Sequence, residues 1–151
     1  MKRLAGSYEN RIDGKGRVSI PKPFRAFFAA RGSETIYLFP SFRQPALEGC
    51  GEDFLDRLQD RIDGLDLFSD KLDDFALLTI GQAMPLSLDP EGRVTLPADL
   101  RDAIGLTDAA MFVGQGERFQ IWEPSAGRAA REAAIERLRA TGATLPARSG
   151  T

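Results

Sequence analysis

The sequence of 151 residues contains no histidine and only one cysteine, Cys50. Without histidine, the chain lacks the commonest general base and the commonest metal ligand. A single cysteine can form neither an internal disulfide nor a structural zinc site, and it fits a reducing cytosol. These absences disfavour enzymes and metalloproteins. We expect no catalytic residue, no metal, no cofactor and no small-molecule substrate.

Long apolar segments are also missing. No run approaches the ~20 residues that a membrane-spanning helix needs. The basic start Met1-Lys2-Arg3 is not followed by the apolar core of a signal peptide. We therefore expect a cytoplasmic protein without a membrane partner. Apolar residues make up 42% of the chain and charged residues 28%, which is typical of a folded globular protein rather than a disordered tail.

Charge is distributed unevenly along the chain. The net charge of −2 argues by itself against a nucleic-acid partner. Residues 1–31, however, carry eight basic and two acidic residues, a net charge of +6, whereas the remainder carries 12 basic and 20 acidic residues. A basic face on an acidic body is typical of an anion-binding surface. Charge alone leaves open the alternative of a solvated N-terminal segment with scattered charges.

One nine-residue stretch occurs twice, at Asp13–Pro21 and Asp89–Pro97, a spacing of 76 residues. The Asp, Gly, Arg, Val and Pro positions match in register. Each copy predicts a tight turn, because an Asp side chain can bond the backbone two residues on and glycine accepts a positive φ. The turn-forming residues are Asp13, Gly14 and Gly16 in the first copy and Asp89 and Gly92 in the second.

The neighbourhood of each copy predicts the same elements. A strand at 6–12 and a return strand at 17–20 form a hairpin around the first turn, and a short helix with Phe24, Phe27 and Phe28 on one face follows. Arg25 in this helix matches Arg101 in the second copy, where Leu100 and Ile104 face inward. The remaining expected strands span 35–39, 46–50, 84–88, 93–96, 110–114 and 119–123, with a hairpin joining the last two. The match beyond the nine residues indicates an internal duplication.

Helices separate and follow the two copies. We expect one at 52–64 and another at 69–80 that Ser69 caps, with Leu72, Phe75, Ala76 and Thr79 on its inner face. Residues 52–81 carry nine acids and three bases. A last helix at 125–140 precedes a frayed end at 141–151. The resulting division is a first repeat at 7–53, an acidic helical connector at 54–82, a second repeat at 83–126, and a C-terminal helix and tail at 127–151.

The first turn has the chemistry of a DNA-reading ribbon. A two-stranded ribbon can enter the major groove, where Arg17 could contact guanine with two hydrogen bonds worth ~1–3 kcal/mol of discrimination. Phosphate contacts would come from Lys15, Lys2, Arg3 and Arg11. In the purely structural alternative, Asp and Gly build the turn and Arg pairs with a neighbouring carboxylate. This alternative is stronger for Arg93, because Glu91 would repel phosphate.

Enzyme motifs are incomplete. The pairs Gly14-x-Gly16 and Gly114-x-Gly116 lack the third glycine of a dinucleotide-binding loop, and no Walker-type Gly-Lys-Ser/Thr sequence occurs. The first turn also lacks the alternating acids of a calcium loop. None of these motifs therefore indicates an enzyme.

The paired motifs, each ending in an apolar-Pro step, resemble those of the MraZ transcriptional regulators. The stretch from Gly116 to Glu123 is similar to the second-repeat hairpin of that family. The resemblance implies two AbrB-like halves that intertwine as a swapped-hairpin barrel and assemble into rings. It implies binding to promoter direct repeats upstream of the division and cell-wall gene cluster, and restraint of the chain's own operon.

Site residues follow from the same resemblance. It makes Arg17 the principal DNA contact, with Lys15 and Asp13 in the same turn, and it maps the second motif to Asp89 and Arg93. Two departures stand out. Leu4-Ala5-Gly6 lacks the family's usual arginine, for which Lys2 and Arg3 are substitutes, and Glu91 stands where the family has a polar or basic residue.

We therefore predict an α+β protein with a mainly β core, a double swapped-hairpin barrel of AbrB type built from two internal repeats. Its predicted function is sequence-specific DNA binding that regulates transcription, as a nucleoid-associated homo-oligomer on double-stranded DNA. The alternative is a scaffold that uses the same barrel only for self-assembly and protein contacts.

Overall fold

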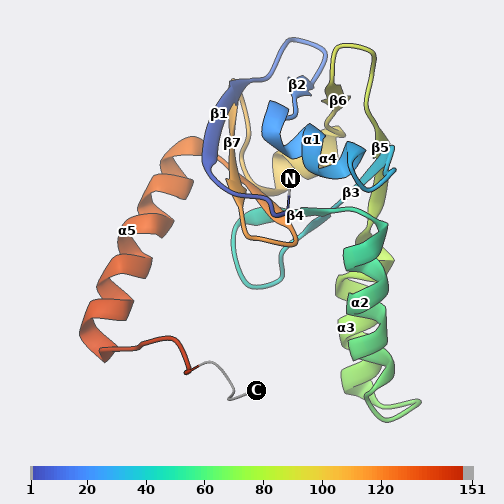
Figure 1. Cartoon of the computed structure of the whole chain (residues 1–151), viewed down its shortest axis with the longest axis vertical. Coiled ribbons are helices and arrows are strands. Elements are labelled where there is room, and N and C mark those ends of the chain that lie inside the picture. The colour runs from blue at the N-terminus through green and yellow to red at the C-terminus, as the bar shows by residue number, and fades with distance from the viewer. Residues whose placement is uncertain (1, 148–151) are drawn as a thin grey trace.

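A computed structural model describes residues 2–147. Its core is an antiparallel six-stranded sheet in the order β1-β7-β8-β4-β3-β5, with a separate two-stranded ribbon of β2 and β6 (Figure 1). The strands are β1 Ser7–Arg11, β2 Arg17–Ser19, β3 Thr35–Pro40, β4 Ala46–Cys50, β5 Met84–Ser87, β6 Arg93–Thr95, β7 Ala109–Gly114 and β8 Phe119–Trp122. The helices are α1 Lys22–Ala29, α2 Glu52–Asp63, α3 Asp70–Leu78, η1 Ile80–Gln82, α4 Ala98–Ala103 and α5 Pro124–Thr141. The predicted α+β class with a mainly β core is confirmed.

Strands of the two repeats pair mainly with each other. In the sheet, β1 pairs with β7, β5 with β3 and β4 with β8, and in the ribbon β2 pairs with β6. Only the hairpins β3–β4 and β7–β8 pair two strands of one repeat. The predicted hairpin of the second repeat is thereby confirmed. Each repeat depends on the other for the hydrogen bonds of its remaining strands.

The hairpin predicted around the first turn is wrong. An isolated bridge joins Ile12 to Val18, but β1 and β2 belong to different sheets and form no ladder with each other. The reason lies in packing, because buried Val18 in the short β2 lies opposite buried Val94 of β6, while β1 forms a full ladder with β7. Among residues 2–147 the sheet is also open, with β1 and β5 at its edges, rather than the closed barrel that the resemblance implies.

The core joins both repeats through aromatic side chains. Phe24 of α1 is fully buried, and its ring centroid lies 5.5 Å from that of Phe119 in β8 and 6.4 Å from that of Phe112 in β7. Phe28 lies 6.1 Å from Phe119 by the same measure. The predicted apolar face of this helix is confirmed, and Leu100 and Ile104 of the second repeat are buried as predicted. Helix α1 of the first repeat is therefore packed against β7 and β8 of the second.

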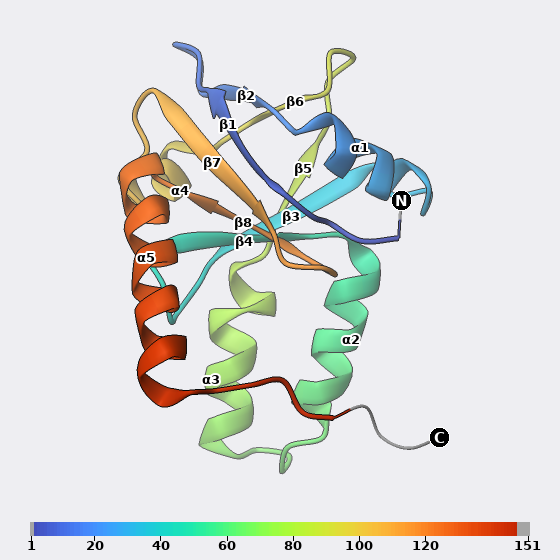
Figure 2. The ribbon, with the colours of Figure 1, turned by 60° about the vertical axis from the view of Figure 1, so that its left-hand side comes forward.

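Helices α2 and α3 form a hairpin that extends from the sheet at the end opposite to the two turns (Figures 1 and 2). Ser69 caps α3 as predicted, since its Oγ accepts a hydrogen bond of 3.2 Å from the Leu72 amide. The predicted inner face of α3 is only partly confirmed. Thr79 is buried, but Phe75 is 40% exposed because the hairpin protrudes from the sheet and leaves part of α3 uncovered.

Helix α5 leaves the sheet beside β7 and extends in the same general direction as the α2–α3 hairpin (Figure 2). Glu123 caps it by accepting hydrogen bonds from the Ser125 and Ala126 amides. The expected frayed end is irregular over 143–147, and 148–151 lie outside the described residues. None of the helices within residues 2–147 combines the length and hydropathy that would be needed to span a membrane.

Candidate nucleic-acid interface

The first turn, Asp13 to Arg17, is fixed by one carboxylate. Asp13 Oδ1 accepts hydrogen bonds from the amides of Lys15 at 3.0 Å and Arg17 at 2.9 Å, and Oδ2 accepts one from Arg17 Nε at 2.6 Å. Gly16 completes the turn with a φ of +80°, which a glycine adopts without strain. The amide of Arg17 is the main cause that lowers the pKa of Asp13 below its usual value. Asp13 therefore stays ionised and holds the Arg17 side chain at neutral pH.

This arrangement reconciles the structural and the DNA-reading interpretations of Arg17. Asp13 engages Nε, which leaves the Nη1 and Nη2 atoms outside the salt bridge. Those two nitrogens form the donor pair that can bind O6 and N7 of guanine together. The side chain is about one-third exposed, at 34%. Asp13 thus orients Arg17 and does not occupy the atoms that would contact a base.

The second turn has the same geometry with one added contact. Asp89 Oδ1 accepts from the Glu91 and Arg93 amides at 2.9 Å each, and Oδ2 accepts from Arg93 Nε at 2.9 Å. In addition, Glu91 Oε2 lies 3.3 Å from Arg93 Nη2. The hydrogen bond to Asp89 is the main cause that raises the pKa of Arg93, and the charge of Glu91 adds to it. One of the two outer nitrogens of Arg93 is therefore already paired.

An arginine of the other repeat lies next to each turn, and for the second turn it also donates a hydrogen bond to the turn. Arg25 Nη1 of α1 donates to the Glu91 carbonyl at 3.4 Å, beneath the second turn. Arg101 of α4 lies beside Gly16 of the first turn, and its Nε donates to the Leu96 carbonyl at 3.1 Å. The sequence pairs these arginines by their spacing, but their supporting role was missed because nothing in the sequence tells which turn each one reaches.

Gly92 offers a test of this support. A Cβ at Gly92 would meet Arg25 Nη1 at 1.8 Å, and its φ is +77°, whereas a Cβ at Gly105, with a φ of +68°, would meet no atom within 4 Å. Gly105→Ala is expected to lower the free energy of unfolding by about 1–2 kcal/mol from backbone strain alone. We expect Gly92→Ala to lose about 1 kcal/mol more, because Arg25 must leave its carbonyl partner. Urea unfolding measures both, and equal losses would contradict a supporting role for Arg25.

The fold gathers only some of the predicted DNA contacts. Lys15 is exposed on the first turn, and Arg11 is exposed at the adjoining end of β1. Both turns project from the same end of the molecule (Figures 1 and 2). Lys2 and Arg3 lie beyond the other end of β1, where the Leu4 amide donates to the Gly116 carbonyl. The structure therefore brings Arg11, Lys15, Arg17 and Arg93 together and separates Lys2 and Arg3 from them.

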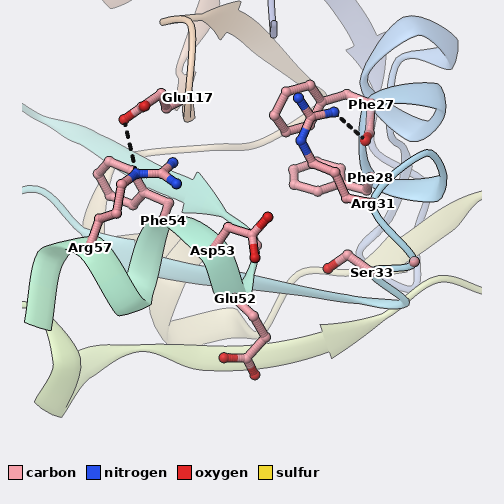
Figure 3. A pocket seen from close by; sticks show the side chains of 11 residues that line it. Phe27, Phe28, Arg31, Ser33, Glu52, Asp53, Phe54, Arg57 and Glu117 are labelled. Atoms are coloured by element: carbon pink, nitrogen blue, oxygen red, sulfur yellow. Dashed lines mark hydrogen bonds and ion pairs between the residues drawn. The ribbon is translucent and has the colours of Figure 1, made fainter. Parts of the chain in front are cut away.

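A hollow of about 240 Å³ lies between α1 and the start of α2 (Figure 3). Arg31 donates to the Phe27 carbonyl at 3.0 Å and stacks on the Phe27 ring, and Arg57 Nε lies 3.4 Å from a Glu117 carboxylate oxygen. Figure 3 shows the Glu52 side chain pointing away from these groups. The two arginines, Arg31 and Arg57, thus engage separate partners on opposite sides of the hollow.

The chain is similar in sequence to known proteins of one family. Residues 79–136 match the family model described as an antitoxin-like MraZ protein. Over 127 residues the chain is 46% identical to the transcriptional regulator MraZ of Parvibaculum lavamentivorans, covering 83% of this chain and 79% of that one. The MraZ of Gluconacetobacter diazotrophicus is 41% identical over 150 residues, covering 97% and 94% of the two chains. That of Rhizobium meliloti is 40% identical over 134 residues, with 88% and 92% covered.

The chain belongs to the MraZ family. The alignments with the relatives span both repeats, whereas the family model matches the second repeat and its flanks. The resemblance found in the two Asp-x-x-x-Arg motifs is thereby confirmed. The MraZ relatives are named for the regulation of transcription and not for catalysis.

Proposed function

We propose that this MraZ protein regulates transcription by binding double-stranded DNA through the turn Asp13–Arg17. The observation that carries the proposal is the Nε-mediated salt bridge to Asp13, which fixes Arg17 and leaves its two outer nitrogens outside the bridge. Arg17 reads guanine in the major groove, and Lys15 and Arg11 contact phosphates beside it. The net charge of +6 over residues 1–31 supports the same surface.

The second turn has a smaller part in this proposal. Arg93 shares the geometry of Arg17, but Glu91 pairs with one of its outer nitrogens and adds a negative charge that would repel a phosphate. Arg93 therefore contributes less to base reading than Arg17. Lys2 and Arg3 remain proposed phosphate contacts only for DNA that extends past the turns along the molecule.

Assembly supplies the affinity that one turn lacks. A single short ribbon covers few base pairs, so we include in the proposal a ring of several copies that binds direct repeats in the promoter of the chain's own division and cell-wall operon, and represses it. Linkage of weak contacts in one assembly raises the affinity without any new contact. Such a regulator acts in the cytoplasm at the nucleoid. The pairing of strands across the repeats supports the AbrB-like swapped-hairpin arrangement as part of this proposal.

The salt dependence of DNA binding distinguishes this function from the scaffold alternative. We expect the affinity for a promoter fragment with intact direct repeats to fall steeply between about 50 and 200 mM salt, because each neutralised phosphate adds about −0.9 to the slope of log K against log salt. Fluorescence anisotropy on the intact fragment and on one with scrambled repeats measures both affinity and specificity. Equal affinity for the two fragments would contradict sequence-specific binding, and absent binding, or binding that is indifferent to salt, would favour a scaffold.

A further inference from the structure

The tip of the α2–α3 hairpin, residues 63–70, exposes apolar side chains that have acidic residues beside them. Leu67 is 75% exposed and Phe68 is 89% exposed. The tip carries three aspartates, Asp63, Asp66 and Asp70, and no basic residue. Phe68 has a φ of +63°, a left-handed conformation that is unfavourable for a bulky residue. The chain therefore holds a large aromatic ring in solvent at the expense of backbone strain.

The complementary feature lies between α5 and the outer face of the sheet. A groove of about 830 Å³ lies there, within the ~300–1,000 Å³ range of pockets that accept a drug-sized ligand. Its apolar wall consists of Met111, Val113 and Trp122 together with the alanine-rich side of α5. Three arginines also line it, Arg131, Arg137 and Arg128, of which Arg128 already pairs with Glu9 at 3.2 Å. The groove thus matches an apolar group with negative charges around it.

The polar groups on the floor of the groove are already bonded to one another. Trp122 Nε1 donates to Gln120 Oε1 at 3.0 Å, and Gln120 Nε2 donates to Glu48 Oε1 at 2.8 Å. Both Gln120 and Trp122 are buried, at 7% and 6% exposure. An apolar side chain that entered the groove would leave these groups satisfied. Desolvation of the floor therefore does not oppose an apolar occupant.

We infer that the hairpin tip of one copy docks in the α5 groove of a second copy. Leu67 and Phe68 enter the groove, and the aspartates of the tip face its arginines. Tip and groove are different surfaces, so each copy donates one tip and accepts another, and the contact can propagate around a ring. The hairpin and α5 both extend away from the two turns (Figures 1 and 2), so docking leaves the turns accessible. The inference deepens the assembly part of the proposed function and rests on it.

Size-exclusion chromatography with light scattering tests the tip and the groove separately. Phe68→Ser is expected to weaken association about 10- to 100-fold, because it removes a large buried apolar group from the contact. Ala134→Trp fills the groove, and Arg131→Glu serves as a second groove variant that changes no apolar packing. Leu138→Ser is the matched control, since Leu138 is 58% exposed and does not line the groove. Circular dichroism verifies that each variant is folded.

Mixing a tip variant with a groove variant tests directly whether the tip of one copy docks in the groove of another. A chain with Phe68→Ser retains its groove, and a chain with Ala134→Trp retains its tip, so an equimolar mixture is expected to form a 1:1 dimer and nothing larger. Charge reversal provides an independent measurement, because Asp66→Arg should restore association to the Arg131→Glu chain. If the Phe68→Ser chain still formed assemblies of the unmodified size, or if the mixture formed no dimer, the inferred docking would be overturned. The proposed function would not be affected by either result. A monomeric unmodified chain would overturn the proposed ring as well, while DNA binding through Arg17 is measured separately.

Discussion

Arg17→Ala is expected to abolish specific binding to the promoter repeats while the chain still assembles. Each engaged subunit loses a two-bond guanine contact worth ~1–3 kcal/mol, a loss of about 5- to 150-fold, and the losses multiply over linked subunits. Assembly is unaffected because the turn projects away from α5 and the α2–α3 hairpin. Mobility shifts on the intact and scrambled fragments measure binding, and light scattering measures assembly.

Two further variants define what Arg17 does. Arg17→Lys retains the charge but cannot form the two parallel bonds, so it should keep salt-dependent binding and lose the preference for the intact repeats. Arg93→Ala is the matched control in the equivalent turn, and we expect a smaller loss because Glu91 already pairs with Arg93. Equal losses from Arg17→Ala and Arg93→Ala would refute this asymmetry. Unchanged binding by Arg17→Ala would refute the role of the turn.

Phe24→Ala is expected to lower the free energy of unfolding by about 3–5 kcal/mol, the usual range for removing a buried aromatic ring. Phe24 belongs to the first repeat, yet its ring packs against Phe112 and Phe119 of the second. Trp122, the only tryptophan, reports on the second repeat. Urea unfolding at one protein concentration, followed by Trp122 fluorescence and by circular dichroism, should therefore show a single transition that moves as a whole.

Phe42→Ala serves as the control for this experiment. Phe42 is 53% exposed in the loop between β3 and β4, and its ring contacts that of Phe75, which is itself 40% exposed, at 5.9 Å between centroids. Its truncation should therefore lower the free energy of unfolding by only about 0.5–1.5 kcal/mol. If Phe24→Ala did not shift the unfolding transition that Trp122 fluorescence reports, the second repeat would unfold independently of the first. Such a result would contradict a core shared between the repeats.

Local features of the fold are readable from the sequence. The Asp13 and Asp89 turns follow from the hydrogen bonds that an Asp side chain makes to the backbone two and four residues on, and Ser69 signals its helix start by the same kind of bond. Phe24, Phe27 and Phe28 identify the buried face of α1 through their spacing. Each of these signals depends on residues close together in the chain.

Strand partners are not readable in the same way. The alternation at Val18 tells that this side chain is buried, but it does not tell that Val94 lies opposite it and that the local hairpin fails to form. The placement of Lys2 and Arg3 away from the turn depends on the same long-range pairing of β1 with β7. The reach of Arg25 to the second turn depends on the pairing of β2, which directly precedes α1, with β6. Contacts between distant segments thus account for what sequence reasoning missed at the site.

The pairing of strands across the repeats also constrains how such a chain can be made and how it could have arisen. During synthesis, β1 leaves the ribosome long before β7, so the first repeat must remain without its partner strands until most of the chain has been translated. A protein with only one repeat would lack these partner strands permanently, and a second molecule would have to provide them. Fusion of two genes that each encode such a protein turns an association between molecules into one within a single chain. It also allows the two turns to carry different side chains, such as Lys15 in the first and Glu91 in the second.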